Sequence, residues 1–124
     1  QMGRLVAFKL DGAATLPADP APAGPVVQVT ETFPAADAEK GKHLWVEFCA
    51  RCHGFETRGS GITPDLRRSQ ALLDANLWKA IVEEGSLAGT GMISWKPFLP
   101  EGATEQLRAY VSEQTRLAAG AARP

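Results

Sequence analysis

The chain contains only two cysteines, Cys49 and Cys52, and a histidine, His53, directly follows the second. Two thiols at this spacing can reach the two vinyl groups on one edge of a porphyrin and form thioether bonds. The adjoining imidazole then lies under the iron and can donate a ring nitrogen to it. The run from Cys49 to His53 therefore predicts one covalently attached haem c.

A redox pair, a zinc site and a disulfide each fit the two cysteines less well than haem attachment does. A thioredoxin-like redox pair needs a strand–helix–strand context, whereas helical patterns and glycine-rich loops flank this motif. A zinc site needs a further ligand with similar spacing, and there is no third cysteine. A structural disulfide across two intervening residues would close a very small loop and stabilise little. Chance is disfavoured because the pattern uses every cysteine.

A second axial ligand would decide whether the iron only transfers electrons or also binds gases. The candidates are Met2, His43 and Met92. Met2 lies far from the motif in the N-terminal tail, and His43 is more typical of a solvated helix position. Met92 lies in a loop whose glycines would let the backbone approach a flat ring closely. We therefore predict that His53 and Met92 are the iron ligands.

Imidazole and thioether ligation has a functional meaning. A soft thioether favours the ferrous state and raises the reduction potential, and a filled coordination sphere leaves no site for dioxygen. Both ligands can stay in place in both redox states. The pattern predicts a single-electron carrier rather than catalysis at the iron. A gas sensor or an oxygen-reactive haem is the alternative if the sixth position is open.

From about Ala36 onward, helical patterns lie both before and after the cysteine motif. We expect a first helix, capped by Asp37, to run straight into the cysteine pair. Further helices are predicted near 69–73, over 76–84 and from Thr104, which would cap the last one. Apolar residues expected to line the core or the haem pocket are Trp45, Phe48, Leu66, Trp78, Ile81 and Leu107.

The first 35 residues have a different composition. Alternating apolar residues over 2–12, closed by the turn signal Asp11-Gly12, predict a strand. Five of the nine prolines lie within 13–35, which predicts an extended linker because proline lacks a backbone donor. Within this linker, the apolar stretch Val26-Val27-Gln28-Val29 is expected to pack against another segment. The predicted units are a terminal strand at 1–12, the linker at 13–35, a helical domain at 36–119 and a tail at 120–124.

Charge and hydropathy exclude some partners. The net charge is −1, so nucleic acid and anionic membranes are not expected to bind. No apolar run approaches the roughly 18 residues that a transmembrane helix needs. A secretory leader is not visible, because Arg4 precedes only a short mixed stretch. We expect either a mature protein or a domain cut from a longer one.

From about Ala36 to Ala119 the sequence resembles class I cytochromes c. The spacing of Gly41 and Trp45 ahead of the motif looks like the family's first helix, in which a glycine and an aromatic residue cross the last helix. Leu107 and Tyr110 match the other side of that crossing. The resemblance implies a small all-α class I cytochrome c fold around one covalently attached haem.

The same resemblance suggests roles for residues around the haem. Pro64 looks like the start of the family's proline segment, whose carbonyl accepts a hydrogen bond from the proximal histidine and fixes its tautomer. Trp95, Arg67 and Arg58 are candidate donors to the haem propionates, since indole N–H and guanidinium groups bind carboxylates.

A narrower resemblance covers the N-terminal part too. Residues 3–12, the linker, residues 64–67 and residues 91–95 look like the C-terminal end of quinohaemoprotein alcohol dehydrogenases, although Ile93 stands where a proline is expected. In those periplasmic enzymes a β-propeller that holds pyrroloquinoline quinone (PQQ) and calcium ends in such a strand, and a tethered cytochrome c domain accepts its electrons.

The resemblance implies a periplasmic relay. Electrons would pass from reduced quinone to this haem and then to an external redox protein or a quinone-linked acceptor. The domain itself would not oxidise alcohol, and the propeller would lie outside this sequence. The alternative is a free-standing periplasmic electron-shuttle cytochrome whose strand packs on the helices. An exposed strand over residues 2–12 also predicts strand-mediated self-association of the isolated domain.

Overall fold

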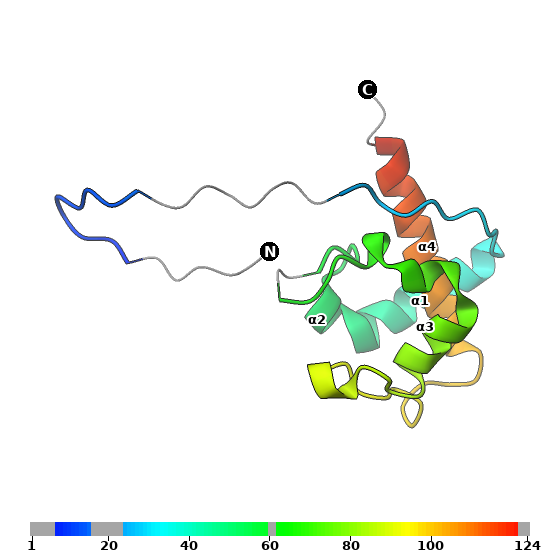
Figure 1. Ribbon diagram of the computed structural model, residues 1–124. Helices are drawn as coiled ribbons and strands as arrows, with labels where there is room; N and C mark the ends of the chain where they lie inside the picture. The colour runs from blue at the N-terminus through cyan, green and yellow to red at the C-terminus, as the bar shows by residue number, and fades with distance from the viewer. Residues whose placement is uncertain (1–6, 16–23, 60–61, 122–124) are drawn as a thin grey trace.

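The computed structural model describes residues 7–15, 24–59 and 62–121. Over these residues the protein is all-α, as predicted, and contains no strand. Figure 1 shows the helices gathered around the long C-terminal helix. None of the helices in the described ranges is long and apolar enough to cross a bilayer.

The first helical run carries the cysteine motif. Helix α1 (Ala35–Leu44) continues without a break into a π-helical turn, η1 (Trp45–Cys49), and then into α2 (Ala50–His53). The prediction that Asp37 caps this run was wrong. Pro34 holds the N-cap position. Asp37 lies in the first turn, where its carboxylate interacts favourably with the positive end of the helix dipole.

Short, well-capped elements follow the motif. Two 3₁₀ segments, η2 (Leu66–Arg68) and η3 (Gln70–Leu73), precede helix α3 (Ala75–Val82). The Asp74 side chain caps α3 by accepting from the backbone N–H groups of Asn76 and Leu77. The helices predicted near 69–73 and over 76–84 are thus present, the first as 3₁₀ helix and the second with slightly earlier bounds.

The last helix, α4 (Ala103–Ala121), forms the spine of the fold. The prediction that Thr104 caps it was wrong, because the helix already includes Ala103 and follows Gly102, whose φ is +77°. α1 crosses α4 at Gly41, where an added Cβ would collide with the carbonyl of Gln106. The predicted glycine crossing of the two helices is therefore present.

The N-terminal segments are described only in part. Gly12 N–H donates to the Lys9 carbonyl at 3.1 Å, which confirms the predicted turn. Residues 7–9 form no strand, and residues 2–6, with Met2, lie outside the described residues. Membership of this segment in another sheet stays a prediction. The end of the predicted linker, residues 24–34, lies against α4, with Val27 buried.

Candidate functional site around His53 and Met92

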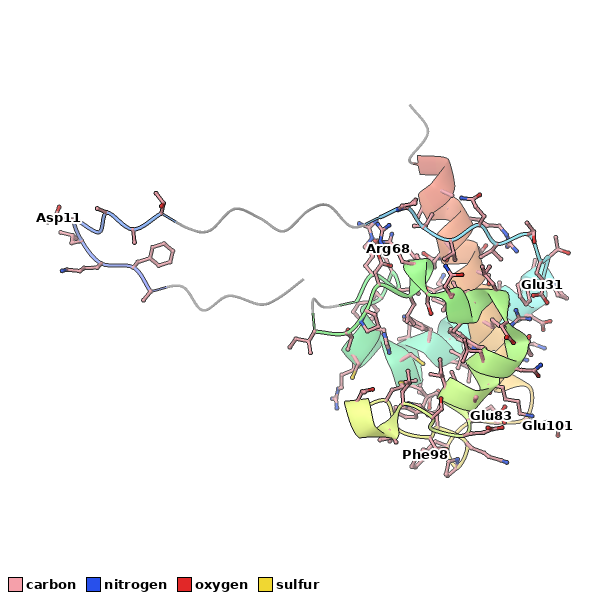
Figure 2. All side chains as sticks on the ribbon, viewed as in Figure 1. Asp11, Glu31, Arg68, Glu83, Phe98 and Glu101 are labelled. Atoms are coloured by element: carbon pink, nitrogen blue, oxygen red, sulfur yellow. The ribbon has the colours of Figure 1, made fainter. Side chains whose placement is uncertain are left out.

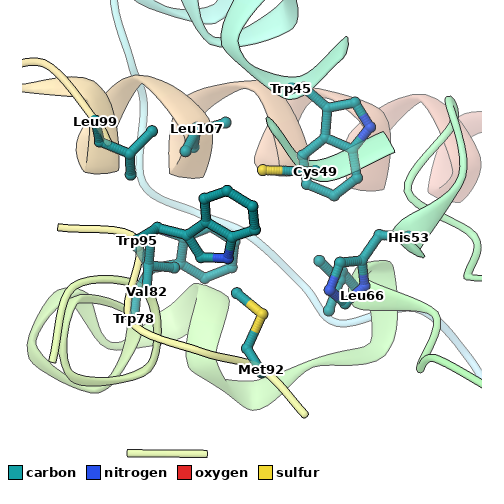
Figure 3. Close-up of a pocket in the computed structure, with 10 residues that line it drawn as sticks. All are labelled: Trp45, Cys49, His53, Leu66, Trp78, Val82, Met92, Trp95, Leu99 and Leu107. Carbon is teal, nitrogen blue, oxygen red and sulfur yellow. The ribbon is translucent and has the colours of Figure 1, made fainter. Parts of the chain in front are cut away.

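One apolar pocket collects side chains from η1, α2, η2, α3, α4 and the loop after α3. Cys49, His53 and Met92, all predicted site residues, line it together (Figure 3). They come from η1, α2 and the loop after α3, and the Met92 side chain extends from its loop toward the interior. The other lining residues are Trp45, Leu66, Trp78, Val82, Trp95, Leu99 and Leu107.

The two cysteines sit in different surroundings. Cys49 is half-buried at the end of the π-helical turn, whereas Cys52 is exposed on α2. Burial, with a smaller contribution from Cys52, raises the pKa of the Cys49 thiol to about 12. Redox-active cysteine pairs instead rely on a thiol with a lowered pKa. The surroundings of Cys49 therefore disfavour a thioredoxin-like pair.

His53 is a buried imidazole with unused bonding capacity. Burial lowers its pKa, which the nearby backbone carbonyl of Pro64 partly offsets, so the ring is neutral at pH 7. Its Nδ1 atom is buried and has no partner in a well-formed hydrogen bond. A neutral imidazole is the form that binds iron, and a carbonyl beside it can orient the ring.

The backbone on the His53 side is held by other elements. Each of four consecutive carbonyls, from Cys52 to Phe55, accepts a hydrogen bond. The donors are Thr63 Oγ1 to Cys52 O at 2.6 Å, Gly59 N to His53 O at 2.8 Å, Trp45 Nε1 to Gly54 O at 2.8 Å and Tyr110 Oη to Phe55 O at 2.9 Å. The Trp45 and Tyr110 rings also contact each other, with centroids 5.8 Å apart.

The Met92 side of the pocket is a long loop with fewer hydrogen bonds to the rest of the fold than the His53 side has. It begins with the 3₁₀ turn η4 (Ala88–Thr90), and Gly91 follows with φ +99°. Its ties to the rest of the fold are the Trp95 N–H to the Val82 carbonyl at 2.8 Å and the Ser94 hydroxyl to the Glu83 carbonyl. The Trp95 ring packs edge-on against Phe48 and Phe98.

The predicted propionate donors divide into two groups. Trp95 lines the apolar pocket, but Arg67 and Arg58 do not. Arg67 donates to both carboxylate oxygens of Asp65, at 2.8 and 2.7 Å, and Arg58 pairs with Glu56 at 2.8 Å. Both arginines border a separate polar hollow beside α4. Donation to a propionate stays a prediction for all three.

The remaining ligand candidate and pocket residues can also be placed. The His43 side chain is 80% exposed and lies 3.5 Å from the Glu39 carboxylate, so it faces solvent and not the pocket. Pro64 is exposed and enters the site only through its backbone. Phe48 and Ile81 are partly buried and do not line the pocket: Ile81 packs against the core, and the Phe48 ring packs against Trp95.

Sequence reasoning missed the hydrogen bonds that hold the motif. Trp45 and Tyr110 were expected only to pack at a helix crossing, yet their polar atoms bind two carbonyls beside His53. The residue types could have predicted these bonds, because a buried Trp or Tyr usually has a hydrogen-bond partner for its N–H or O–H group. The ion pair of Asp65 with Arg67 was also missed.

These residues fit a haem. The pocket offers apolar walls, a neutral imidazole and a thioether, and the two thiols are on the same helical run. The Met92 loop is the wall of this pocket with fewer hydrogen bonds to the rest of the fold.

Comparison with known proteins gives the family. Residues 36–111 match the family described as "Cytochrome C oxidase, cbb3-type, subunit III". The chain belongs to this cytochrome c family. A cytochrome c domain implies haem c as the cofactor and electron transfer as the function.

The chain also matches part of several much longer proteins. It is 40% identical over 111 residues to quinohemoprotein alcohol dehydrogenase ADH IIB of Pseudomonas putida, a match over 87% of this chain and 16% of that protein. It is 36% identical over 114 residues to lupanine 17-hydroxylase [cytochrome c] of a Pseudomonas species, over 90% of this chain and 16% of that protein. A quinone alcohol dehydrogenase subunit of Gluconobacter oxydans is 29% identical over 108 residues. The predicted resemblance to the cytochrome domain of quinohaemoprotein alcohol dehydrogenases is confirmed, and this chain spans only about a sixth of the length of the first two relatives.

Proposed function

We propose that this chain holds one haem c, joined by thioethers to Cys49 and Cys52 and ligated by His53 and Met92, and relays electrons from a PQQ dehydrogenase domain to an external acceptor. The observation that carries the proposal is the shared pocket. Cys49 and His53 of the motif and Met92 of a loop much later in the sequence line the same apolar space.

When bound, the haem supplies a one-electron couple between ferric and ferrous iron. The chain's own residues supply the surroundings for that couple. His53 offers a neutral nitrogen because burial lowers its pKa. Met92 offers a soft thioether, which favours the ferrous state. The apolar side chains of Trp78, Val82 and other lining residues exclude water and keep the local polarity low.

The dehydrogenase context rests on the relatives. Two of them carry names that contain quinohemoprotein or quinone together with alcohol dehydrogenase, and this chain matches only a small part of each. We place alcohol oxidation, PQQ and calcium in a preceding propeller domain and the electron exit in this domain. The acceptor is then an external redox protein or a quinone-linked partner, and the compartment is the periplasm.

Co-expression with haem attachment machinery tests the first part of the proposal. The purified chain should carry one haem that survives denaturation, with the far-red absorption band of methionine-ligated ferric haem. Cys52→Ala, a change at an exposed position, should leave the haem attached through Cys49 alone, with one unreacted vinyl group that shifts the absorption of the denatured haemoprotein, and Met92→Leu should keep the covalent haem but remove the band. A chain that never acquires covalent haem would contradict the proposal.

Fusion to a matching PQQ domain tests the relay. Addition of alcohol to the fused, PQQ-loaded protein should reduce the haem within the same molecule, at a rate that does not depend on protein concentration. The control is the same fusion without PQQ. If alcohol never reduces the haem, or does so only in a concentration-dependent way, the relay fails and a free-standing shuttle is the better description.

A further inference from the structure

Arg108 on α4 is a buried cation that binds a segment far away in the sequence. Its side chain is only 3% exposed. The guanidinium donates to both carboxylate oxygens of Glu31, at 2.7 and 2.8 Å, although the two residues are 77 positions apart. It also donates to the Leu72 carbonyl and to Glu105, a residue of α4 itself.

Contacts on both sides extend this attachment along residues 24–34. The Phe33 ring lies 4.8 Å from the Arg108 guanidinium carbon and 6.0 Å from that of Arg116, within the range of cation–π attraction. Arg116 also donates to the Glu31 carbonyl. Toward the N-terminus, Val27 is buried and its N–H donates to the Arg67 carbonyl at 2.9 Å.

The opposite charges of Glu31 and Arg108 stabilise each other. Hydrogen bonding from Arg108 lowers the pKa of Glu31, against the opposing effect of burial, so the pair is ionised at pH 7. Because Arg108 is buried, losing Glu31 leaves it dependent on Glu105 and on one carbonyl. A buried charge that loses a partner is strongly unfavourable. The docked segment is thus coupled to the helical core.

We propose that the α4 face formed by Arg108 and Arg116 is a binding surface for the chain's own segment 24–34, which acts as a strap and belongs to the domain rather than to the linker. Any tether to a preceding domain then ends beside Arg67, where Val27 is bound. Residues 13–23 can span at most about 40 Å, whereas the whole of 13–35 could span about 80 Å. A shorter tether restricts the positions that a tethered partner can reach.

Amide exchange of Val27 tests the strap, because its N–H bond reports whether the segment is docked. Glu31→Ala and Glu105→Ala form a matched pair, since both carboxylates bind the same guanidinium and both side chains are 53% exposed. Only the first belongs to the strap. We expect Glu31→Ala to speed exchange of the Val27 amide by roughly tenfold or more, and Glu105→Ala to leave it nearly unchanged.

Phe33→Leu and Arg108→Lys extend the test without deleting either residue. Phe33→Leu removes the ring but keeps an apolar side chain, so Val27 exchange should accelerate by a smaller factor. Arg108→Lys keeps the charge and loses the bidentate fork, and should resemble Glu31→Ala. The proposal is overturned if the Val27 amide exchanges at the unprotected rate in the unchanged protein, or if Glu31→Ala and Glu105→Ala accelerate it equally.

Discussion

The two walls of the pocket, one carrying His53 and the other Met92, are held in different ways. On the His53 wall, four successive carbonyls are bound by side chains or backbone groups from several parts of the fold. On the Met92 wall, a glycine-containing loop is tied to α3 through Trp95 and Ser94. Figure 2 shows the yellow loop after α3, with Phe98 beside it, along the lower edge of the helices.

Unequal walls let a small domain present one fixed and one adjustable group. Because α1 and α4 hold the His53 wall rigidly, its imidazole would stay in place during electron transfer, which keeps the reorganisation energy low. A loop with fewer ties can open locally at a smaller free-energy cost than the packed helices can. Substitutions on the two walls can test this contrast, and the greatest loss of stability is expected at the helix crossing.

Substitutions at two glycines should lower the stability by very different amounts if the walls differ in rigidity. Gly41→Val places a side chain against the Gln106 carbonyl and forces α1 away from α4, so the free energy of unfolding should fall by about 3 kcal/mol. Gly89→Ala in the Met92 loop meets no atom within 4 Å and should change it by less than about 0.5 kcal/mol. Urea denaturation measures both. Equal losses would mean that the two walls are equally rigid.

A second pair compares single hydrogen bonds. Trp45→Phe removes the N–H that binds the Gly54 carbonyl from a side chain that is 1% exposed, and should lower the free energy of unfolding by about 2 kcal/mol. Ser94→Ala removes the bond to the Glu83 carbonyl on the other wall and should lower it by about 0.5 kcal/mol. The ordering of the two losses in thermal melts is the readout, and a reversed order contradicts the comparison.

Met92→Leu separates stability from ligation. The half-buried thioether is replaced by a side chain of similar volume, so the packing contribution to the free energy of unfolding should change by less than about 1 kcal/mol. In the haem-loaded protein the same change should abolish the far-red methionine band and lower the reduction potential. Retention of the band would assign the sixth ligand to another residue.

Acid titration should give the weakest response and concerns the segment after Pro64. Burial alone would raise the pKa of Asp65, but hydrogen bonds and charge from Arg67 and Arg68 outweigh it and lower the pKa below the usual 3.8. Asp65 therefore contributes stability above about pH 3.8, and this contribution is lost as the pH falls through the lowered value. Stability measured from pH 5 to pH 2 should fall less steeply in Asp65→Asn.

Element types followed from the sequence more closely than element ends. The apolar spacing of Leu107, Tyr110 and Val111 placed the last helix correctly, since periodicity reflects the buried face. The caps at Asp37 and Thr104 were misplaced. Capping contributes only about 1 kcal/mol, so packing against α4 or a left-handed glycine such as Gly102 moved these two helix starts by two or three residues.

Chemistry that lies within one helical turn could be derived from the amino-acid order alone. The order Cys49, Cys52, His53 presents two thiols and an imidazole together in any helix, and the family match over 36–111 includes the same local pattern. The loop position of Met92 already suggested it as a partner of His53, but their shared pocket and the Arg108–Glu31 pair are seen only in the packed fold, where the loop after α3 and the segment 24–34 lie against the helices. Pairings across so many residues depend on how faces pack, and local periodicity carries no information about them.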